Sequence, residues 1–204
     1  MSTSRPKKKR AAAPRGYHHG NLRQALLEAG LQMLEDTAHG EPSLRELSRQ
    51  AGVSANAAYR HFADKEALLQ ALAAEGFQRL ALAQAKAARS AKKSQEAHRA
   101  AGKAYVAFAR ANPGLFKLMF GRAPSEPTGE LKSAGEFAFN ALRAGAAQAL
   151  KLDIEDPKVA YAAIRSWSLV HGLSQLILAG HLDDLGADLE PVIDAVLRAP
   201  PPPA

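Results

Sequence analysis

The sequence predicts an all-α protein, and three observations support that fold class. The 204 residues include 44 alanines but only six valines and four isoleucines, so helix formers are abundant and strand formers are scarce. Apolar residues recur with the period of a helix, and no stretch alternates as a strand would. The internal prolines fall where that periodicity starts or stops, namely at Pro42, Pro113, Pro124, Pro127, Pro157 and Pro191.

Capping signals place the helices of the N-terminal part. An apolar stripe over residues 22–34 predicts the first helix. Ser43 and Glu46 form a capping box that opens a second helix, which Gly52 ends. Two further helices are predicted over 54–62 and 64–80. The expected N-caps of the four helices are Asn21, Ser43, Ser54 and Asp64.

The same periodicity predicts the helices of the C-terminal part. Residues 84–99 are rich in Ala, Lys and Arg, so we expect a solvated helix end or a linker there. A helix from about residue 95 stops at Asn112-Pro113, because proline cannot continue it. A short apolar segment follows over 115–120, and 122–128 are expected to form a loop. The last helices are predicted over 129–150, 157–180 and 187–198.

Residues 43–62 have the pattern of a helix-turn-helix. The two short helices meet at Ala51-Gly52-Val53, a tight corner that needs a residue tolerant of positive φ. The side chains expected to pack inside are Leu44, Leu47, Ala51 and Val53. The exposed face of 54–62 then carries Ser, Asn, Tyr, Arg and His, which suit the base edges and phosphate oxygens of DNA. The alternative is an ordinary helical hairpin with a glycine corner.

The positive charge is concentrated at the N-terminus. The net charge is +7, and residues 1–16 contain six basic residues and no acid, so only +1 remains for the other 188 residues. Residues 17–80 carry six basic and eight acidic residues, a net charge of −2. Because non-specific DNA affinity comes mainly from neutralised phosphates, we expect the basic arm to supply it. The alternative is a disordered solubilising tail.

Five stretches resemble the DNA-binding domain of the tetracycline-repressor (TetR) family. They are Tyr17-His18-His19-Gly20-Asn21-Leu22-Arg23, Ser43-Leu44-Arg45-Glu46-Leu47, Ala51-Gly52-Val53-Ser54, Tyr59-Arg60-His61-Phe62 and Lys65-Glu66-Ala67-Leu68-Leu69. Downstream, Asn112-Pro113-Gly114-Leu115-Phe116-Lys117-Leu118-Met119-Phe120 and Trp167-Ser168-Leu169-Val170-His171-Gly172 resemble the C-terminal domain of the TetR subgroup named for its Trp-His-Gly motif. The resemblance implies a homodimeric transcription regulator, usually a repressor, that a small ligand releases from DNA.

The resemblance also implies which residues contact DNA. Phosphate contacts fall on Tyr59, His61 and Lys65, with Ser43 and Arg45 at the second helix. Base reading falls on the stretch that contains Ser54, Ala55, Asn56, Tyr59 and Arg60. The N-terminal contacts are expected at Lys7, Lys8, Lys9, Arg10, Arg15, Tyr17 and His18. Ala57 and Ala58 stand where threonine and leucine are common in the family, so the operator sequence is not predicted.

The C-terminal helices supply candidates for a ligand pocket and a dimer interface. The pocket candidates are Tyr105, Phe108, Phe116, Phe120, Phe137, Trp167 and His171, with Phe139 in the same aromatic group. The interface candidates are Ala160, Ile164, Val170, Val192 and Val196. A two-fold axis would place two recognition helices about 34 Å apart in successive major grooves. For both sets the alternative is an ordinary core within one chain.

Composition and motifs exclude several classes of function. Without cysteine there is no disulfide, thiolate metal site or cysteine nucleophile. The seven histidines contain no pair four residues apart, so we expect no metal ion and no cofactor. No phosphate loop or nucleophile motif indicates an enzyme. No apolar run is long enough for a membrane span, and none follows the basic arm as a secretory signal requires.

The sequence therefore predicts four segments and one main function. The segments are a disordered basic arm (1–16), a helix-turn-helix domain (17–80), a helical regulatory and dimerisation domain (81–199) and a disordered tail (200–204). The expected function is a cytoplasmic, ligand-responsive transcription regulator whose partners are a palindromic DNA operator, a second copy of the chain and a small effector. The alternative is an architectural DNA-binding protein that relies on the arm and shows no preference for a palindrome.

Overall fold

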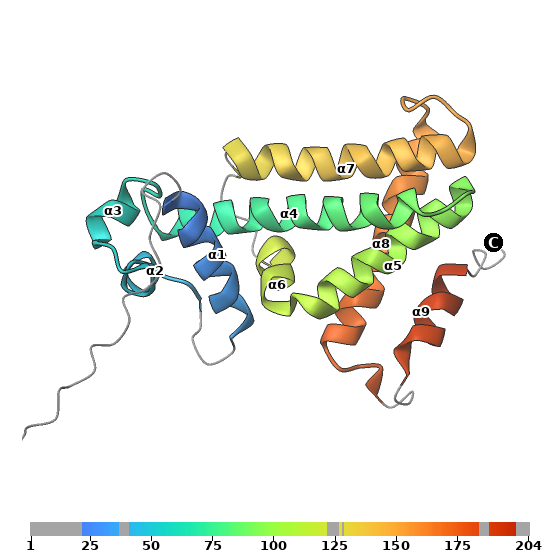
Figure 1. Ribbon diagram of the computed structural model, residues 1–204. Coiled ribbons are helices and arrows are strands. Elements are labelled where there is room, and N and C mark those ends of the chain that lie inside the picture. Colours follow the sequence, from blue (N-terminus) through green and yellow to red (C-terminus); the bar gives the residue numbers. More distant parts are fainter. Residues whose placement is uncertain (1–21, 37–40, 122–126, 128, 184–187, 199–204) are drawn as a thin grey trace, which may run out of the picture.

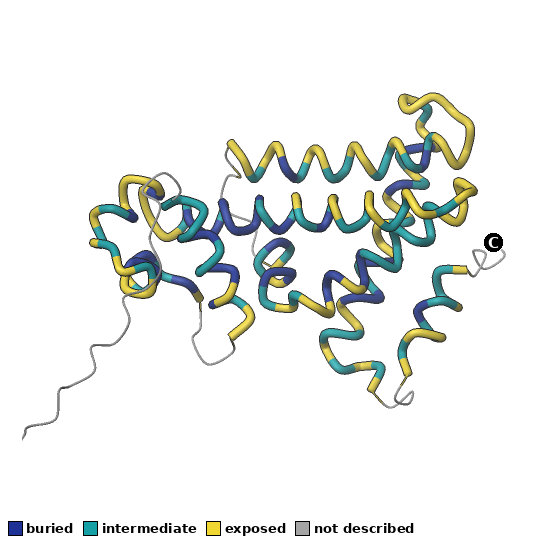
Figure 2. Tube along the Cα trace, in the orientation of Figure 1, coloured by how far each residue is buried: buried dark blue, intermediate teal, exposed yellow. Residues whose placement is uncertain are grey.

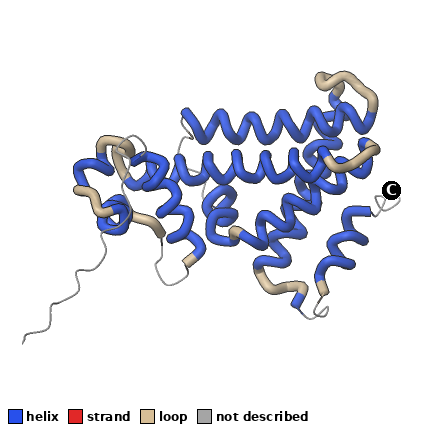
Figure 3. The backbone as a smooth tube through the Cα atoms, in the orientation of Figure 1, coloured by secondary structure: helices blue, strands red, loops and turns tan. Residues whose placement is uncertain are grey.

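The structure is a computed structural model that describes residues 22–36, 41–121, 127, 129–183 and 188–198. Within these residues the chain forms nine α-helices and no strand, so the predicted all-α fold class is confirmed (Figures 1 and 3). The helices are α1 (Leu22–Glu35), α2 (Leu44–Ala51), α3 (Ala55–Tyr59), α4 (Lys65–Arg89), α5 (Ser94–Ala111), α6 (Pro113–Gly121), α7 (Gly129–Leu150), α8 (Pro157–Leu178) and α9 (Leu189–Arg198). The predicted arm, the predicted tail and Asn21 lie outside the described residues.

The helix α2 has the cap and the corner that the sequence predicts. Ser43 Oγ accepts a hydrogen bond from the backbone N–H of Glu46 at 3.3 Å, which satisfies one of the free donors at the start of the helix. Gly52 ends the helix with a φ of 66°, in the left-handed region where a side chain would be strained. Leu44 and Leu47 are buried, as expected for the inner face of a helix-turn-helix.

The helix α3 is shorter than predicted. Its N-cap is Ser54, whose hydroxyl accepts from the N–H of Ala57 at 3.2 Å. The helix ends at Tyr59 rather than at Phe62, because the chain tightens into a turn in which the His61 N–H donates to a carbonyl three residues back. This turn carries the Phe62 ring into the core, where it is 3% exposed.

The long helix α4 joins the two parts of the chain (Figure 1). Asp64 caps it by accepting from the N–H of Ala67 at 2.8 Å. Its 25 residues span about 37 Å, and they run to Arg89. Of the two expectations for residues 84–99, a solvated helix end or a linker, the helix end is observed up to Arg89, because the alanine-rich sequence favours helix, and only a short turn separates α4 from α5. The expected boundary at residue 80 falls inside this helix.

The helices α5 and α7 pack against α4, and α8 packs in turn against α5 and α7. Figure 2 shows that the buried residues of α4 lie mainly in its first half. One hydrophobic core runs from α1 through α4 and α6 to α9, and includes Leu26, Leu72, Phe116 and Ile193. The N-terminal and C-terminal parts therefore share a core. No helix in the described ranges is long and apolar enough to cross a membrane.

The helix α6 meets the end of α1 in a close contact. The Glu35 carboxylate accepts hydrogen bonds from the backbone N–H groups of Gly114 (3.2 Å) and Leu115 (2.9 Å). These donors belong to the first turn of α6, which has no partner for them within the helix. A side-chain carbon added at Gly114 would overlap the backbone carbonyl of Leu34. The sequence therefore allows α1 and α6 to touch backbone to backbone.

Candidate functional site

The outer side of the helix-turn-helix presents polar side chains to solvent. Exposed residues in this segment are Ser54, Asn56, Tyr59, Arg60 and His61, and Tyr59 is 45% exposed. On the opposite side, Ala58 is completely buried and fixes α3 to the core, while Ala55 is half-buried. The small side chain at Ala58 therefore brings α3 close to the core without covering its polar side. This surface is accessible to a DNA duplex.

The other residues expected to contact phosphate lie beside this surface. Arg45 is exposed in the first turn of α2. The Ser43 hydroxyl accepts a capping hydrogen bond and still has its own proton to donate. Lys65 Nζ forms an ion pair with Glu41 Oε2 at 2.6 Å, so a phosphate at this site would compete with that carboxylate. The N-terminal candidates Lys7, Lys8, Lys9, Arg10, Arg15, Tyr17 and His18 lie outside the described residues.

A cavity of about 210 Å³ lies between α4, α5, α6, α7 and α8. The predicted residues Tyr105, Phe120 and Trp167 line it, together with Phe139. Most of the remaining wall is apolar, with Gln84 as the one amide in the lining. The cavity therefore suits a ligand, or part of a ligand, that is mainly apolar.

The structure corrects four of the seven pocket candidates. Phe137 points away from the cavity and is 64% exposed, because it lies two residues from Phe139 and so on the other side of α7. Phe108 and Phe116 are buried in the core behind the cavity rather than in its lining. His171 is not in the lining but stands behind it, next to Tyr105 and with its ring centroid 4.7 Å from that of Phe120.

Three of these side chains form a hydrogen-bonded group at the cavity wall. The Trp167 indole N–H donates to the Tyr105 hydroxyl oxygen at 3.3 Å, and that hydroxyl lies 2.9 Å from His171 Nδ1. Burial raises the pKa of Tyr105 to about 12, partly offset by the hydrogen bond from Trp167. Burial also lowers the pKa of His171 below its usual value of 6.5. A neutral imidazole whose Nδ1 accepts a hydrogen bond from the Tyr105 hydroxyl lets that hydroxyl donate to His171 while it accepts from Trp167.

The lowered histidine pKa values predict a pH dependence of stability. Burial lowers the pKa of both His171 and His98, so both are neutral in the folded chain where free histidine titrates. Below about pH 6.5 the unfolded chain then binds more protons than the folded chain, and the free energy of unfolding falls as the pH falls. Above that pH the contribution is constant. Urea denaturation between about pH 8 and pH 5.5 measures this slope. A double variant, His98→Gln with His171→Gln, should show a shallower slope, and equal slopes would contradict the prediction.

Sequence reasoning missed the wall that α4 contributes to the cavity. Phe77, Leu80 and Gln84 line it from one face of that helix. Their spacing of three and four residues is the signal in the sequence that identifies one helical face. The composition of the segment from residue 84 onward obscures this signal, because it is also typical of a linker. Val170 of α8 completes the wall.

The exposed side of α8 carries apolar side chains among the exposed polar residues Arg165, Ser168 and Gln175, and these apolar side chains are called the apolar row below. Tyr161, Ile164 and Leu176 are 70%, 48% and 45% exposed, respectively. The predicted interface residue Ile164 lies in this row. Val170 does not, because it is buried at the cavity wall and is not available to a partner, which corrects that prediction. The other predicted interface residues, Ala160, Val192 and Val196, are half-buried.

The sequence matches two family models. The model of the tetR family of bacterial regulatory proteins matches residues 26–72. The model of a tetracyclin repressor-like C-terminal domain matches residues 98–199, half of the chain. No curated protein matches the sequence.

Solved structures share the fold along most of the chain. A protein of unknown function from Rhodococcus sp. RHA1 is 35% identical, with a TM-score of 0.73 over 90% of this chain and 93% of that chain. FadR from Bacillus subtilis, in complex with stearoyl-CoA, is 15% identical, with a TM-score of 0.64 over 86% and 95% of the two chains. The TetR family regulator PfmR from Thermus thermophilus is 21% identical, with a TM-score of 0.59 over 85% and 97%. With an accessible helix-turn-helix and both family models matched, the chain belongs to the TetR family of DNA-binding transcriptional regulators, a family without enzymatic activity.

Proposed function

We propose that this regulator is a homodimeric repressor that binds a palindromic operator and leaves it when an apolar effector enters the cavity. The observation that supports this proposal is the position of α6, which lies between the cavity and the DNA-binding helices. Phe120 of α6 lines the cavity, and the Phe116 ring stacks on His171 at 5.5 Å between centroids. The other end of α6 is held by Glu35 of α1.

A ligand would therefore act on DNA binding through α6. An effector that displaces Phe120 moves a helix whose first turn is hydrogen-bonded to α1. Because α1 packs against α2 and α3, this movement changes the position of the recognition surface in the subunit. In a dimer, the two recognition helices would then no longer match half-sites one helical turn apart. Ligand binding favours the arrangement that does not fit the operator.

We further propose the finer assignments that follow from the resemblance. The chain is placed in the cytoplasm, where its operator DNA lies. Trp167, His171 and Gly172 stand in the order of the Trp-His-Gly subgroup, and two of them belong to the hydrogen-bonded group beside the cavity. FadR from Bacillus subtilis is a structural relative that holds stearoyl-CoA, which supports an effector with an apolar part.

The proposal is tested by selecting bound fragments from random DNA with the purified full chain. We expect a palindrome with two half-sites about one helical turn apart. In competition, the selected site should bind about a thousandfold or more tightly than unrelated DNA. Equal binding of both would contradict the proposal and favour an architectural protein. Release of the selected site by apolar compounds then tests the response to an effector.

Arg60 is expected to read bases, whereas Lys65 is expected to contact phosphate. A bidentate arginine–guanine contact gives about 1–3 kcal/mol of discrimination, so Arg60→Ala should weaken operator binding about 10- to 100-fold and leave unrelated DNA nearly unaffected. Lys65→Ala should instead weaken both DNAs alike and reduce the salt slope by about one. Fluorescence anisotropy titrations at several salt concentrations measure both effects. If Arg60→Ala weakens both DNAs equally, its role in base reading is wrong.

The basic arm is expected to supply affinity that does not depend on sequence. Deleting residues 2–15 removes six positive charges. The truncated chain should bind every DNA more weakly and show a flatter dependence of affinity on salt, because fewer counterions are released. The same titrations on operator and unrelated DNA measure the slope. An unchanged slope would assign the arm to solubility instead.

A further inference from the structure

We propose that the effector is one unbranched alkyl chain with an anionic head group, and that it lies along a tract between α4, α5 and α7. The tract consists of the cavity described above and two cavities that adjoin it, one with a smaller volume and one with a similar volume. This inference rests on the proposed function, since it specifies the chemical class of the effector and the direction in which it lies. It extends the apolar wall at Trp167 and Phe120 toward the opposite end of the molecule.

The three cavities adjoin one another and share part of their lining. Gln84 of α4 and Leu142 of α7 line all three of them. The second cavity measures about 90 Å³ and the third about 240 Å³. Along α4 the lining runs from Phe77 to Ala88, which corresponds to about 17 Å at 1.5 Å per residue. The space is therefore long rather than compact.

The third cavity is lined mainly by small residues. Eight of its thirteen lining residues are alanine or glycine, and the polar ones are Gln84, Ser94, His98 and Gln148. Gly145 and Ala141 form its side on α7, where larger side chains would fill the space. An extended alkyl chain advances about 1.3 Å per carbon, because bonds of about 1.5 Å meet near 111°. A tract of about 17 Å therefore accommodates about 13 carbons in a row.

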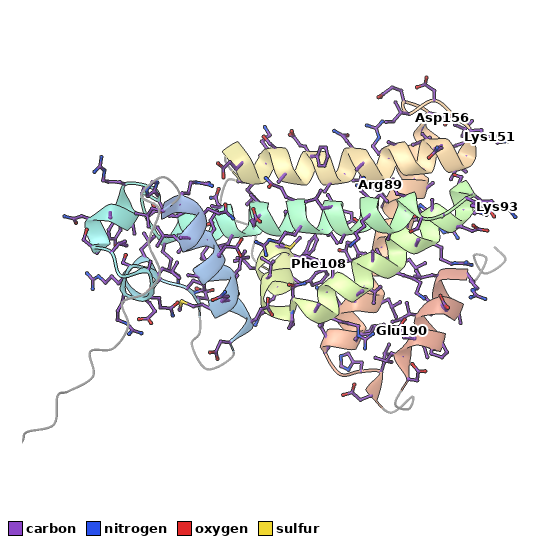
Figure 4. The ribbon with its side chains drawn as sticks, in the orientation of Figure 1. Arg89, Lys93, Phe108, Lys151, Asp156 and Glu190 are labelled. Carbon is purple, nitrogen blue, oxygen red and sulfur yellow. The ribbon has the colours of Figure 1, made fainter. Side chains whose placement is uncertain are left out.

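The end of the tract at the turn between α4 and α5 is positively charged. Residues 86–93 contain Lys86, Arg89, Lys92 and Lys93 and no acidic residue. Within the described part of the chain, none of these four forms an ion pair. Figure 4 shows Lys93 and Lys151 at the same end of the molecule. Four cations at an open end favour an anionic group there.

Carboxylates near this end are mostly engaged with other groups. Asp156 caps α8 by accepting from the N–H of Lys158 at 2.8 Å, and Glu155 lies 3.4 Å from Arg143. Glu96 lies in the first turn of α5, where the helix dipole favours it. The opposite end of the tract is less suited to an anion, because the Tyr105 hydroxyl already contacts Trp167 and His171.

The head group therefore lies near the turn between α4 and α5, and the end of the alkyl chain reaches toward Phe120. This orientation makes chain length decisive. A short chain fixed at the cationic end does not reach α6, whereas a chain of about 13 carbons does. The tract thus measures the length of the ligand, and only a sufficiently long chain displaces the helix that contacts α1.

The experiment uses the full chain and a series of saturated fatty acids of six to eighteen carbons, their coenzyme A thioesters, and the matching neutral alcohols. Binding is measured by calorimetry, and release is measured on the selected operator. We expect affinity to rise about fourfold per added carbon, the value for burying one methylene, and to level off near 13 carbons. Alcohols should bind at least tenfold more weakly than acids of equal length. Tighter binding of the free acid or of the coenzyme A thioester shows which of the two forms the protein recognises, and either result supports the proposal.

Two matched variants on α7 test the path of the chain. Ala141 and Ala144 are both exposed on the same helix, but Ala141 lines the third cavity and Ala144 lines none of the three. Ala141→Phe should weaken chain acids at least tenfold, whereas Ala144→Phe should leave their binding unchanged. Lys92→Gln with Lys93→Gln should weaken acids but not alcohols. Equal effects of Ala141→Phe and Ala144→Phe, or affinity that does not depend on chain length, would overturn the proposal.

The outcomes also separate this inference from the proposed function. If compact apolar compounds release the operator and long-chain acids do not bind, the proposed ligand class is wrong, and the proposed function as a ligand-responsive repressor is retained. If chain acids bind as described but operator binding does not change, the tract stands and the proposed response is wrong.

Discussion

Replacing Ile164 by aspartate should convert the proposed dimer into a monomer that binds its operator about 100-fold or more weakly. Ile164 is 48% exposed, in the apolar row of α8 that includes Tyr161 and Leu176. A carboxylate in this row would be buried without a partner when two copies associate. Loss of the second subunit removes the second half-site, and linked binding of two sites exceeds either alone by about two to four orders of magnitude. The effect is therefore on DNA binding, although the substitution lies far from α3.

The measurement combines molar mass in solution with titration of the operator. The chain has a mass of 21.7 kDa, so monomer and dimer are easily distinguished by light scattering. Leu82→Asp is the matched control, because Leu82 is 65% exposed but lies on α4, outside the apolar row. That variant should remain a dimer and keep its affinity. A dimeric Ile164→Asp protein with normal operator affinity would show that the interface lies elsewhere.

The helix-turn-helix could be predicted from the sequence because its signals are local. A cap or a corner is determined by a few neighbouring residues, and Ser43, Gly52 and Asp64 each take the predicted conformation. Periodicity likewise placed α5 and α8 within a few residues of their observed bounds. Such signals depend only on residues within about one turn of helix, so they can be identified in the sequence itself.

The cavity was harder to predict because it depends on how helices are rotated. Phe137 and Phe139 are both aromatic residues among alanines, and two positions along a helix differ in direction by about 200°. Nothing in the alanine-rich α7 distinguishes the side that faces α4, so the prediction of Phe137 is wrong and Phe139 is the residue that lines the cavity. Packing against α4 and α8 decides the rotation, and this information is not local.

Gly114→Ala should produce the largest loss of stability among single methyl additions in the described residues of α6. The added carbon would overlap the backbone carbonyl of Leu34, and a backbone atom cannot rotate away as a side chain can. Overpacking of this kind costs about 3 kcal/mol, which lowers Tm by about 10 °C in a domain of this size. The separation of α1 and α6 would also break the two hydrogen bonds that Glu35 accepts.

The matched control is Gly145→Ala, since a side-chain carbon there meets nothing within 4 Å. That variant should be neutral or more stable, because alanine favours helix by about 1 kcal/mol over glycine. Glu35→Gln provides a milder test, since it keeps the size of the side chain but loses the charge that favours the start of α6. Calorimetric unfolding of the three variants compares them directly. Because α6 and α1 are joined at this contact, Gly114→Ala should also weaken operator binding in the absence of any ligand. If the variant keeps both its Tm and its operator affinity, the contact neither stabilises the fold nor connects α6 to the DNA-binding helices.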